Sequence, residues 1–155
     1  MSSFRAGKRI AFDFGMSRVG VAHSTSDGIL CSPLITLPND AELMGNVLEL
    51  LVKEEPFEIY VGLPLNLQGL HTVSTEAAIS FARALESAAE VSVRMVDERL
   101  STRGAQAQLH ASGKNTRNSK TLIDAAAATL ILESAIAFEK ATGRLPGKET
   151  SELNA

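Results

Sequence analysis

Three carboxylates stand far apart in the chain, each where a strand or a helix could present its side chain. Asp13 interrupts an apolar strand pattern, and Glu98 follows another strand at its C-terminal edge. Asp124 falls in the first turn of an alanine-rich helix that is expected to begin near Thr121. An acid inside an apolar strand costs several kcal/mol of desolvation unless another group compensates its charge. Three converging acids would repel one another, and oxygen ligands of this kind suit the hydrated Mg²⁺ of phosphoryl-transfer sites.

Two of these acids also have a purely structural interpretation. Asp13 could be a surface acid on an edge strand, although Phe12 and Phe14 on either side of it argue against exposure. Asp124 has capping-box spacing from Thr121. Its carboxylate could therefore bond the free N–H groups of the helix and complement the helix dipole.

Basic residues are concentrated near Glu98. The net charge of the chain is −3, so no global basic field draws it to nucleic acid. Residues 94–120 nevertheless hold six basic residues against two acids, Asp97 and Glu98. This segment predicts a phosphate-facing surface. The alternative is a solvated charge cluster in which Asp97 and Glu98 pair with Arg99 or Arg103.

Length and composition predict one globular domain. The 155 residues are 45% hydrophobic and 21% charged, which is ordinary for such a domain. The single cysteine, Cys31, excludes an intramolecular disulfide framework and fits a reducing compartment. No apolar run reaches the roughly 18 residues of a membrane span, and no signal-peptide pattern is seen. We expect a cytoplasmic protein with no membrane partner, a single domain over residues 1–145 and a disordered tail over residues 146–155.

Hydrophobic periodicity and turn signals predict an α/β fold. Strands are expected at 8–14, 18–24, 29–37, 58–65 and 91–97. Helices are expected from Asn39, as the N-cap, to Pro56, over 73–88, from Thr102 to Gly113 and over 121–142, with a basic polar loop at 114–120. The first three strands resemble an antiparallel meander. The alternation that follows predicts a mixed five-stranded sheet flanked by helices.

Four motifs follow one another along the chain. They are Asp-Phe-Gly at 13–15 with Arg-Val-Gly-Val-Ala at 18–22, Gly-Leu-Pro-Leu-Asn at 62–66, Asp-Glu-Arg-Leu-Ser-Thr at 97–102, and Asp-Ala-Ala-Ala-Ala at 124–128. In this order they resemble the YqgF/RuvX family, nucleases with an RNase H-like fold that are related to the RuvC Holliday junction resolvases. The resemblance covers about residues 8–140. It implies that Asp13, Glu98 and Asp124 are catalytic metal ligands, with Asp97 as an outer-shell acid.

The resemblance also implies a substrate and a cofactor. It implies maturation of the 5′ end of the 16S rRNA precursor, with Holliday junction cleavage as the alternative. One or two Mg²⁺ ions, or Mn²⁺ in their place, would activate a water and stabilise the leaving 3′-oxygen. The implied partners are structured RNA or branched DNA and ribosomal precursor particles, bound by a monomer or a weak homodimer. The residues expected to grip substrate phosphates are Arg18, Arg99, Arg103, Lys114, Arg117 and Lys120.

Two other classes of function fit parts of the pattern. A catalytically inert nucleic-acid-binding module could share this fold, but acids at all three positions favour an enzyme. An actin-like ATPase also begins its phosphate-binding strands with Asp-x-Gly, but it needs two such domains, and 155 residues supply one. Ser17, where the family often has a basic residue, and residues 68–70 depart from the family pattern without changing a carboxylate.

Overall fold

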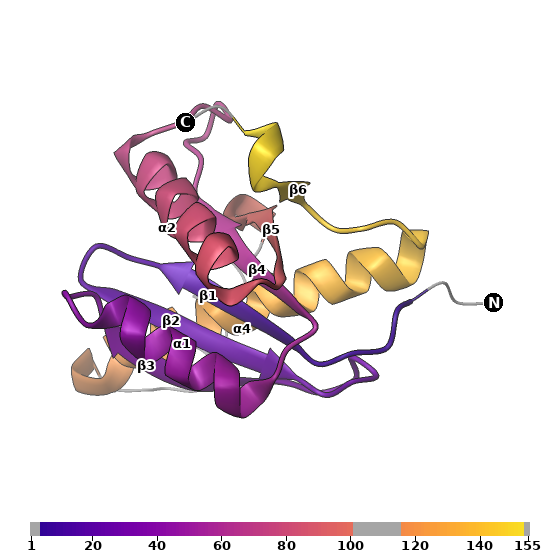
Figure 1. Cartoon of the computed structure of the whole chain (residues 1–155). Coiled ribbons are helices and arrows are strands. Elements are labelled where there is room, and N and C mark those ends of the chain that lie inside the picture. The colour runs from indigo at the N-terminus through magenta and orange to yellow at the C-terminus, as the bar shows by residue number, and fades with distance from the viewer. Residues whose placement is uncertain (1–3, 101–115, 154–155) are drawn as a thin grey trace.

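The protein forms a six-stranded mixed sheet flanked by helices (Figure 1). The structure is a computed structural model that describes the backbone of residues 4–100 and 116–153, and the side chains of residues 4–99 and 125–153. The strands are β1 (Arg9–Phe14), β2 (Arg18–Ser24), β3 (Cys31–Pro38), β4 (Glu58–Leu63), β5 (Ser92–Asp97) and β6 (Lys148–Glu149). The helices are α1 (Leu43–Glu54), α2 (Val73–Ala89) and α4 (Thr116–Thr142), with short 3₁₀ turns η1 (Glu98–Leu100) and η2 (Thr150–Glu152).

The strand order β3-β2-β1-β4-β5-β6 places β1 and β5 on either side of β4. Strands β1, β2 and β3 pair antiparallel, as the predicted meander requires. Strands β1, β4 and β5 are parallel, so their C-terminal ends lie together. This confirms the predicted mixed sheet, to which β6 adds a sixth strand. The C-terminal ends of β1 and β5 are the places where Asp13 and Glu98 occur.

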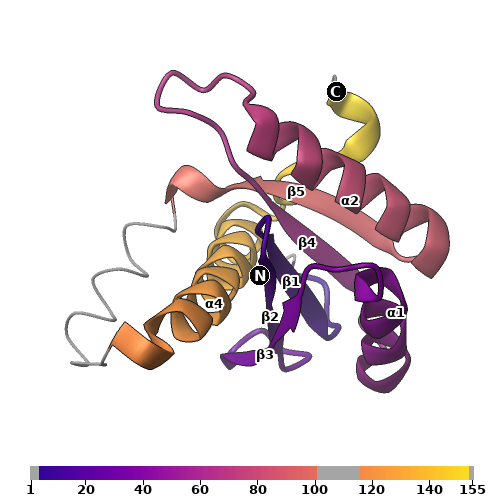
Figure 2. The same cartoon turned by 90° about the vertical axis from the view of Figure 1, so that its left-hand side faces the viewer.

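Strand alternation divides the apolar residues into two cores, one on each face of the sheet. Phe12, Val61 and Met95 point to the face covered by α1 and α2. Ala11 and Tyr60 point to the opposite face, which α4 covers. Figure 2 shows the sheet between these two helical layers. Residues two apart in a strand face the same side of the sheet. Asp13 follows Ala11 by two residues and therefore lies on the face that α4 covers.

The C-terminal segment is folded, which corrects the expectation of a disordered tail from residue 146. Residues 148 and 149 pair with β5, and Leu153 is buried in the core against α2. Arg83 of α2 donates to the backbone carbonyl of Leu153 (2.6 Å), and Thr150 donates to Glu86 (2.6 Å). The sequence suggested disorder because one leucine among polar residues carries no periodic pattern. Tertiary contacts with α2 supply the order.

Two helix starts also differ from expectation. Helix α1 begins at Leu43, with Glu42 as its N-cap and no side-chain cap. Asn39, the expected cap, instead donates from its side chain to the carbonyl of Gly15 (2.7 Å) and so ties the β1–β2 turn to β3. Helix α4 begins at Thr116, so residues 116–120 of the expected basic loop are helical. The helix expected between 102 and 113 lies outside the described residues.

A buried ionic cluster joins α4 to the start of the sheet. Glu139 of α4 accepts hydrogen bonds from Arg5 (2.7 Å) and from the fully buried Arg9 (3.2 Å). Glu58 of β4 accepts from Arg5 as well (2.6 Å). Burial of Glu139 opposes its ionisation, but the hydrogen bonds from Arg5 and the positive charges of Arg9 and Arg5 outweigh it and lower its pKa to about 2. The cluster therefore fixes the position of the helix that carries Asp124.

Glu139→Gln is expected to destabilise the fold by about 3–5 kcal/mol at neutral pH, because it leaves Arg9 buried without a full counter-charge. The ionised carboxylate stabilises the fold fully above its ordinary pKa of 4.5, and this contribution is lost as the pH falls towards 2. Urea unfolding of parent and variant should thus converge between pH 5 and pH 2. Glu133→Gln, at an exposed position of the same helix, is the matched control. A variant as stable as the parent at pH 7 would contradict the role of the cluster.

Within the described part of the chain, no helix is long and apolar enough to cross a membrane.

Candidate active site

Asp13 lies near the C-terminal end of β1, on the sheet face that α4 covers. It follows the fully buried Ala11 by two residues and is itself half-buried. The β1–β4 pairing ends at Phe12 and Val61, and Asp13 and Gly62 are the residues that directly follow this last pair. The interpretation of Asp13 as an acid on an edge strand is wrong, because β1 pairs on both sides, with β2 and with β4.

Glu98 is the residue that follows β5, and its side chain crosses β4 to reach Asp13. It follows Val96 by two residues, and Val96 belongs to the core beneath α4. The Glu98 and Asp13 carboxyls share a hydrogen bond. Burial raises the pKa of Glu98, the charge of Asp13 and this shared hydrogen bond raise it further, and Asp97 adds a smaller effect, to give about 9. The pair therefore holds a proton at neutral pH in the absence of another positive charge.

Asp97 behaves differently from its neighbour Glu98. It pairs with Leu63 in the sheet register and forms an ion pair with Arg99, with 2.7 Å between Asp97 Oδ2 and Arg99 Nη2. The backbone N–H of Arg99 also donates to Asp97 (2.9 Å). The guanidinium hydrogen bonds of Arg99 lower the pKa of Asp97. The predicted solvated charge cluster is therefore present for Asp97 and Arg99. Glu98 is not part of it, because its side chain points to Asp13 beneath α4.

Asp124 lies in helix α4, but its side chain is outside the described residues. Because α4 begins at Thr116, Asp124 is in the third turn of the helix. The capping-box interpretation is therefore wrong, since the N–H groups around residue 124 already bond within the helix. Asp124 precedes the fully buried Ala128 by one helical turn. This spacing puts residue 124 on the same helix face as Ala128, which packs on the sheet.

Comparison with known proteins places this chain in a family. The family model RuvX, described as a Holliday junction resolvase, matches residues 7–137. The chain belongs to the RuvX family. A relative from Clavibacter sepedonicus, named "Putative pre-16S rRNA nuclease", is 45% identical over 92% of this chain and 91% of its own length. A relative of the same name from Streptomyces coelicolor is 41% identical over 93% of this chain and 88% of its own.

Solved structures of RuvC share the fold of this RuvX chain. Thermus thermophilus RuvC, in complex with a Holliday junction substrate, superposes with a TM-score of 0.59 over 92% of this chain and 98% of RuvC. A second structure of the same RuvC gives a TM-score of 0.56. Sequence identity is 16% in both cases, so the likeness establishes the RNase H-like fold alone.

The expected phosphate-binding residues of this RuvX chain are only partly described. Arg18 begins β2 next to the β1–β2 turn and is half-buried. Arg99 is exposed and held by Asp97. The remaining four basic positions are not described as side chains: Arg103 and Lys114 lie outside the described residues, and Arg117 and Lys120 lie in the first turns of α4.

The oxygen donors of Asp13 and Glu98 fit a hard divalent cation. Two carboxyls share a half-buried site, where burial and the charge of Asp13 raise the pKa of Glu98. Such a cation compensates this repulsion and binds through carboxylate oxygens. Among the side chains that the structure describes, no three histidines, cysteines or acids are grouped around one point. Asp124, the third acid expected from the sequence, lies outside the described side chains.

Gly62 contributes to the site in a way that sequence analysis missed. It lies in β4 between the two acids and begins the Gly-Leu-Pro-Leu-Asn motif at 62–66, to which the sequence alone assigned no role in the site. Such a glycine often marks a place where another group approaches the backbone closely.

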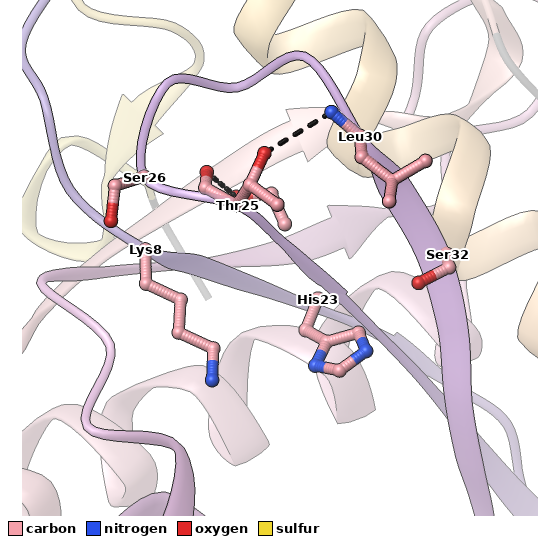
Figure 3. A pocket seen from close by; sticks show the side chains of 7 residues that line it. Lys8, His23, Thr25, Ser26, Leu30 and Ser32 are labelled. Atoms are coloured by element: carbon pink, nitrogen blue, oxygen red, sulfur yellow. Dashed lines mark hydrogen bonds between the residues drawn. The ribbon is translucent and has the colours of Figure 1, made fainter.

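A cavity of about 560 Å³ lies at the opposite end of the sheet (Figure 3). Lys8 and His23 line it, and both bind Glu54, at 2.9 Å and 2.7 Å. Thr25 accepts a hydrogen bond from the backbone N–H of Leu30 (3.2 Å). Lys8 and His23 of this cavity are thus both paired with Glu54. The cavity is separate from the two acids.

Proposed function

We propose that this protein is a metal-dependent nuclease that hydrolyses phosphodiester bonds. The observation that carries the proposal is the contact between Asp13 and Glu98 across β4. Two acids that meet in a half-buried site destabilise each other, and the fold retains the arrangement. A binding module without catalysis would have no need of this contact.

Asp13, Glu98 and Asp124 are the proposed ligands of Mg²⁺, with Mn²⁺ as an alternative. A bound divalent ion supplies Lewis acidity that lowers the pKa of a water and stabilises the leaving oxygen. The carboxylates act here as ligands rather than as a general acid and base. Asp97, held by Arg99, is the proposed outer-shell acid, because its position beside Glu98 lets it stabilise the ionic arrangement without binding the ion.

The proposed substrate is the 5′ end of the 16S rRNA precursor. The support is the name shared by relatives that are 45% and 41% identical over more than nine-tenths of this chain. Free precursor RNA or ribosomal precursor particles in the cytoplasm would then be its partners. The proposed phosphate contacts are Arg18, Arg99, Arg103, Lys114, Arg117 and Lys120.

Holliday junction cleavage is the second candidate, favoured by the description of the family model. Symmetric cleavage of a junction requires two active sites, and so a dimer. A protein that remains monomeric in light scattering at cleavage concentrations, with and without junction DNA, would count against this candidate.

Side-by-side cleavage assays distinguish the candidates. Precursor 16S rRNA, a four-way DNA junction and an unbranched DNA duplex are each incubated with the protein in Mg²⁺, in Mn²⁺ and in a chelator. We expect the precursor to be cut at least about 10-fold faster than either DNA, and the chelator to stop the reaction. Faster cleavage of the junction would favour the resolvase. No cleavage of any substrate with either metal, despite binding, would favour the inert module.

A further inference from the structure

Gly62 stands between the two acids on the α4 face of the sheet. It pairs with Val96 of β5, and both Gly62 and Asp13 directly follow Val61 and Phe12, the last pair between β4 and β1. Because glycine has no side chain, the space above β4 at this point is open to a neighbour. The Glu98 side chain occupies that space on its way from β5 to β1.

A methyl group on residue 62 would collide with two side chains. It would lie 2.7 Å from Glu98 Cγ, 2.9 Å from Glu98 Cδ and 2.7 Å from Ile131 Cδ1. Carbon atoms that are not bonded approach to about 3.5–4.0 Å. The Ile131 methyl is the end of a flexible side chain and can turn aside. Glu98 Cγ lies in the middle of its side chain, so displacing it displaces the carboxyl.

We infer that Gly62 is a positioning residue for Glu98: a residue without a side chain at position 62 is what lets the Glu98 carboxyl cross β4 and meet Asp13. The inference rests on the proposed function, in which Asp13 and Glu98 are two ligands of one metal site. It predicts that a methyl group, which changes no charge and removes no ligand, is enough to impair that site.

Titration of the full-length protein with Mn²⁺, followed by calorimetry, tests this role without relying on cleavage. Gly62→Ala is expected to weaken Mn²⁺ binding by about 10–100-fold, the usual effect of losing the support of a metal ligand. Gly45→Ala is the matched control, since a methyl group at that position of α1 has no atom within 4 Å. The control should bind Mn²⁺ like the parent and melt at the same or a higher temperature.

Two further variants separate the Glu98 collision from the Ile131 collision. Ile131→Val removes the Cδ1 atom, so G62A/I131V relieves the packing of α4 but not the displacement of Glu98. This double variant should recover melting temperature but not Mn²⁺ affinity. Glu98→Ala removes the other colliding atoms, so adding G62A to E98A should lower the melting temperature less than adding it to the parent. This cycle remains informative even if G62A alone folds poorly.

The possible failures are distinguishable. If Asp13→Asn weakens Mn²⁺ binding and G62A does not, the positioning role of Gly62 is overturned and the metal site stands. Recovery of Mn²⁺ affinity in G62A/I131V would also overturn that role, because the defect would then lie in helix packing. If Asp13→Asn binds Mn²⁺ as the parent does, the proposed metal site itself is overturned, and with it the inference about Gly62.

Discussion

Asp13→Asn is expected to reduce metal-dependent cleavage by at least about 10²–10³-fold while leaving the fold intact. The variant loses a negatively charged oxygen ligand in a half-buried site, and the remaining acids hold a cation less tightly. The folded protein should not suffer, because the carboxylate of Asp13 is one of the groups that disfavour ionisation of Glu98. The melting temperature of the metal-free variant should be unchanged or a few degrees higher than that of the parent.

Asp27→Ala is a control that should affect stability and leave cleavage unchanged. Asp27 lies in the β2–β3 turn at the far end of the sheet, where it accepts hydrogen bonds from Thr25 Oγ1 (2.6 Å) and the backbone N–H of Ile29 (3.0 Å). Its loss should lower the melting temperature slightly and leave cleavage at 25 °C unchanged. A large fall in the melting temperature of Asp13→Asn, accompanied by normal cleavage at a permissive temperature, would show that Asp13 is structural.

Strands and their faces were accessible from the sequence because they follow local rules. Short, mostly continuous apolar runs predict β1 and β4 as buried strands, and the turn residues after each strand set its end. The position of Asp13 at the centre of the sheet follows from the parallel pairing of β1 with β4. The four motifs added the family, and with it the proposed role of the three acids.

Features that depend on distant neighbours were not accessible. Leu153 is buried because it packs into the core beside α2 and β5. The residues around it in the sequence do not predict this burial. The polar start of α4 lacks apolar periodicity, so the sequence suggested a loop where the helix already runs. The role of Gly62 depends on the side chain of a residue 36 positions later in the chain. The sequence shows a glycine at the start of a motif, and the sheet order shows which side chain passes over it.

Glu98→Gln should remove a pH dependence of stability that the parent shows without metal. The folded-state pKa of Glu98 is raised from 4.5 to about 9, by burial first and by Asp13 second. Between these values the folded protein holds a proton that the unfolded chain releases. The contribution of Glu98 to the free energy of unfolding is therefore greatest below about pH 4.5, and it declines as the pH rises towards 9. The decline from pH 5 to pH 8 should be on the order of 2–4 kcal/mol.

Urea unfolding in a chelator, at unit pH steps from 5 to 9, measures this decline. The Gln side chain keeps the size of Glu98 and cannot ionise, so the variant should be more stable than the parent at pH 8 and nearly equal to it at pH 5. Mg²⁺ should stabilise the parent more at pH 8 than at pH 5, because the ionised pair binds it, and should stabilise the variant little at either pH. Glu49→Gln, at an exposed position of α1 on the other face of the sheet, should follow the parent throughout. A parent whose stability does not fall between pH 5 and pH 8 would mean that Glu98 and Asp13 ionise independently, and the two acids would then not form one metal site.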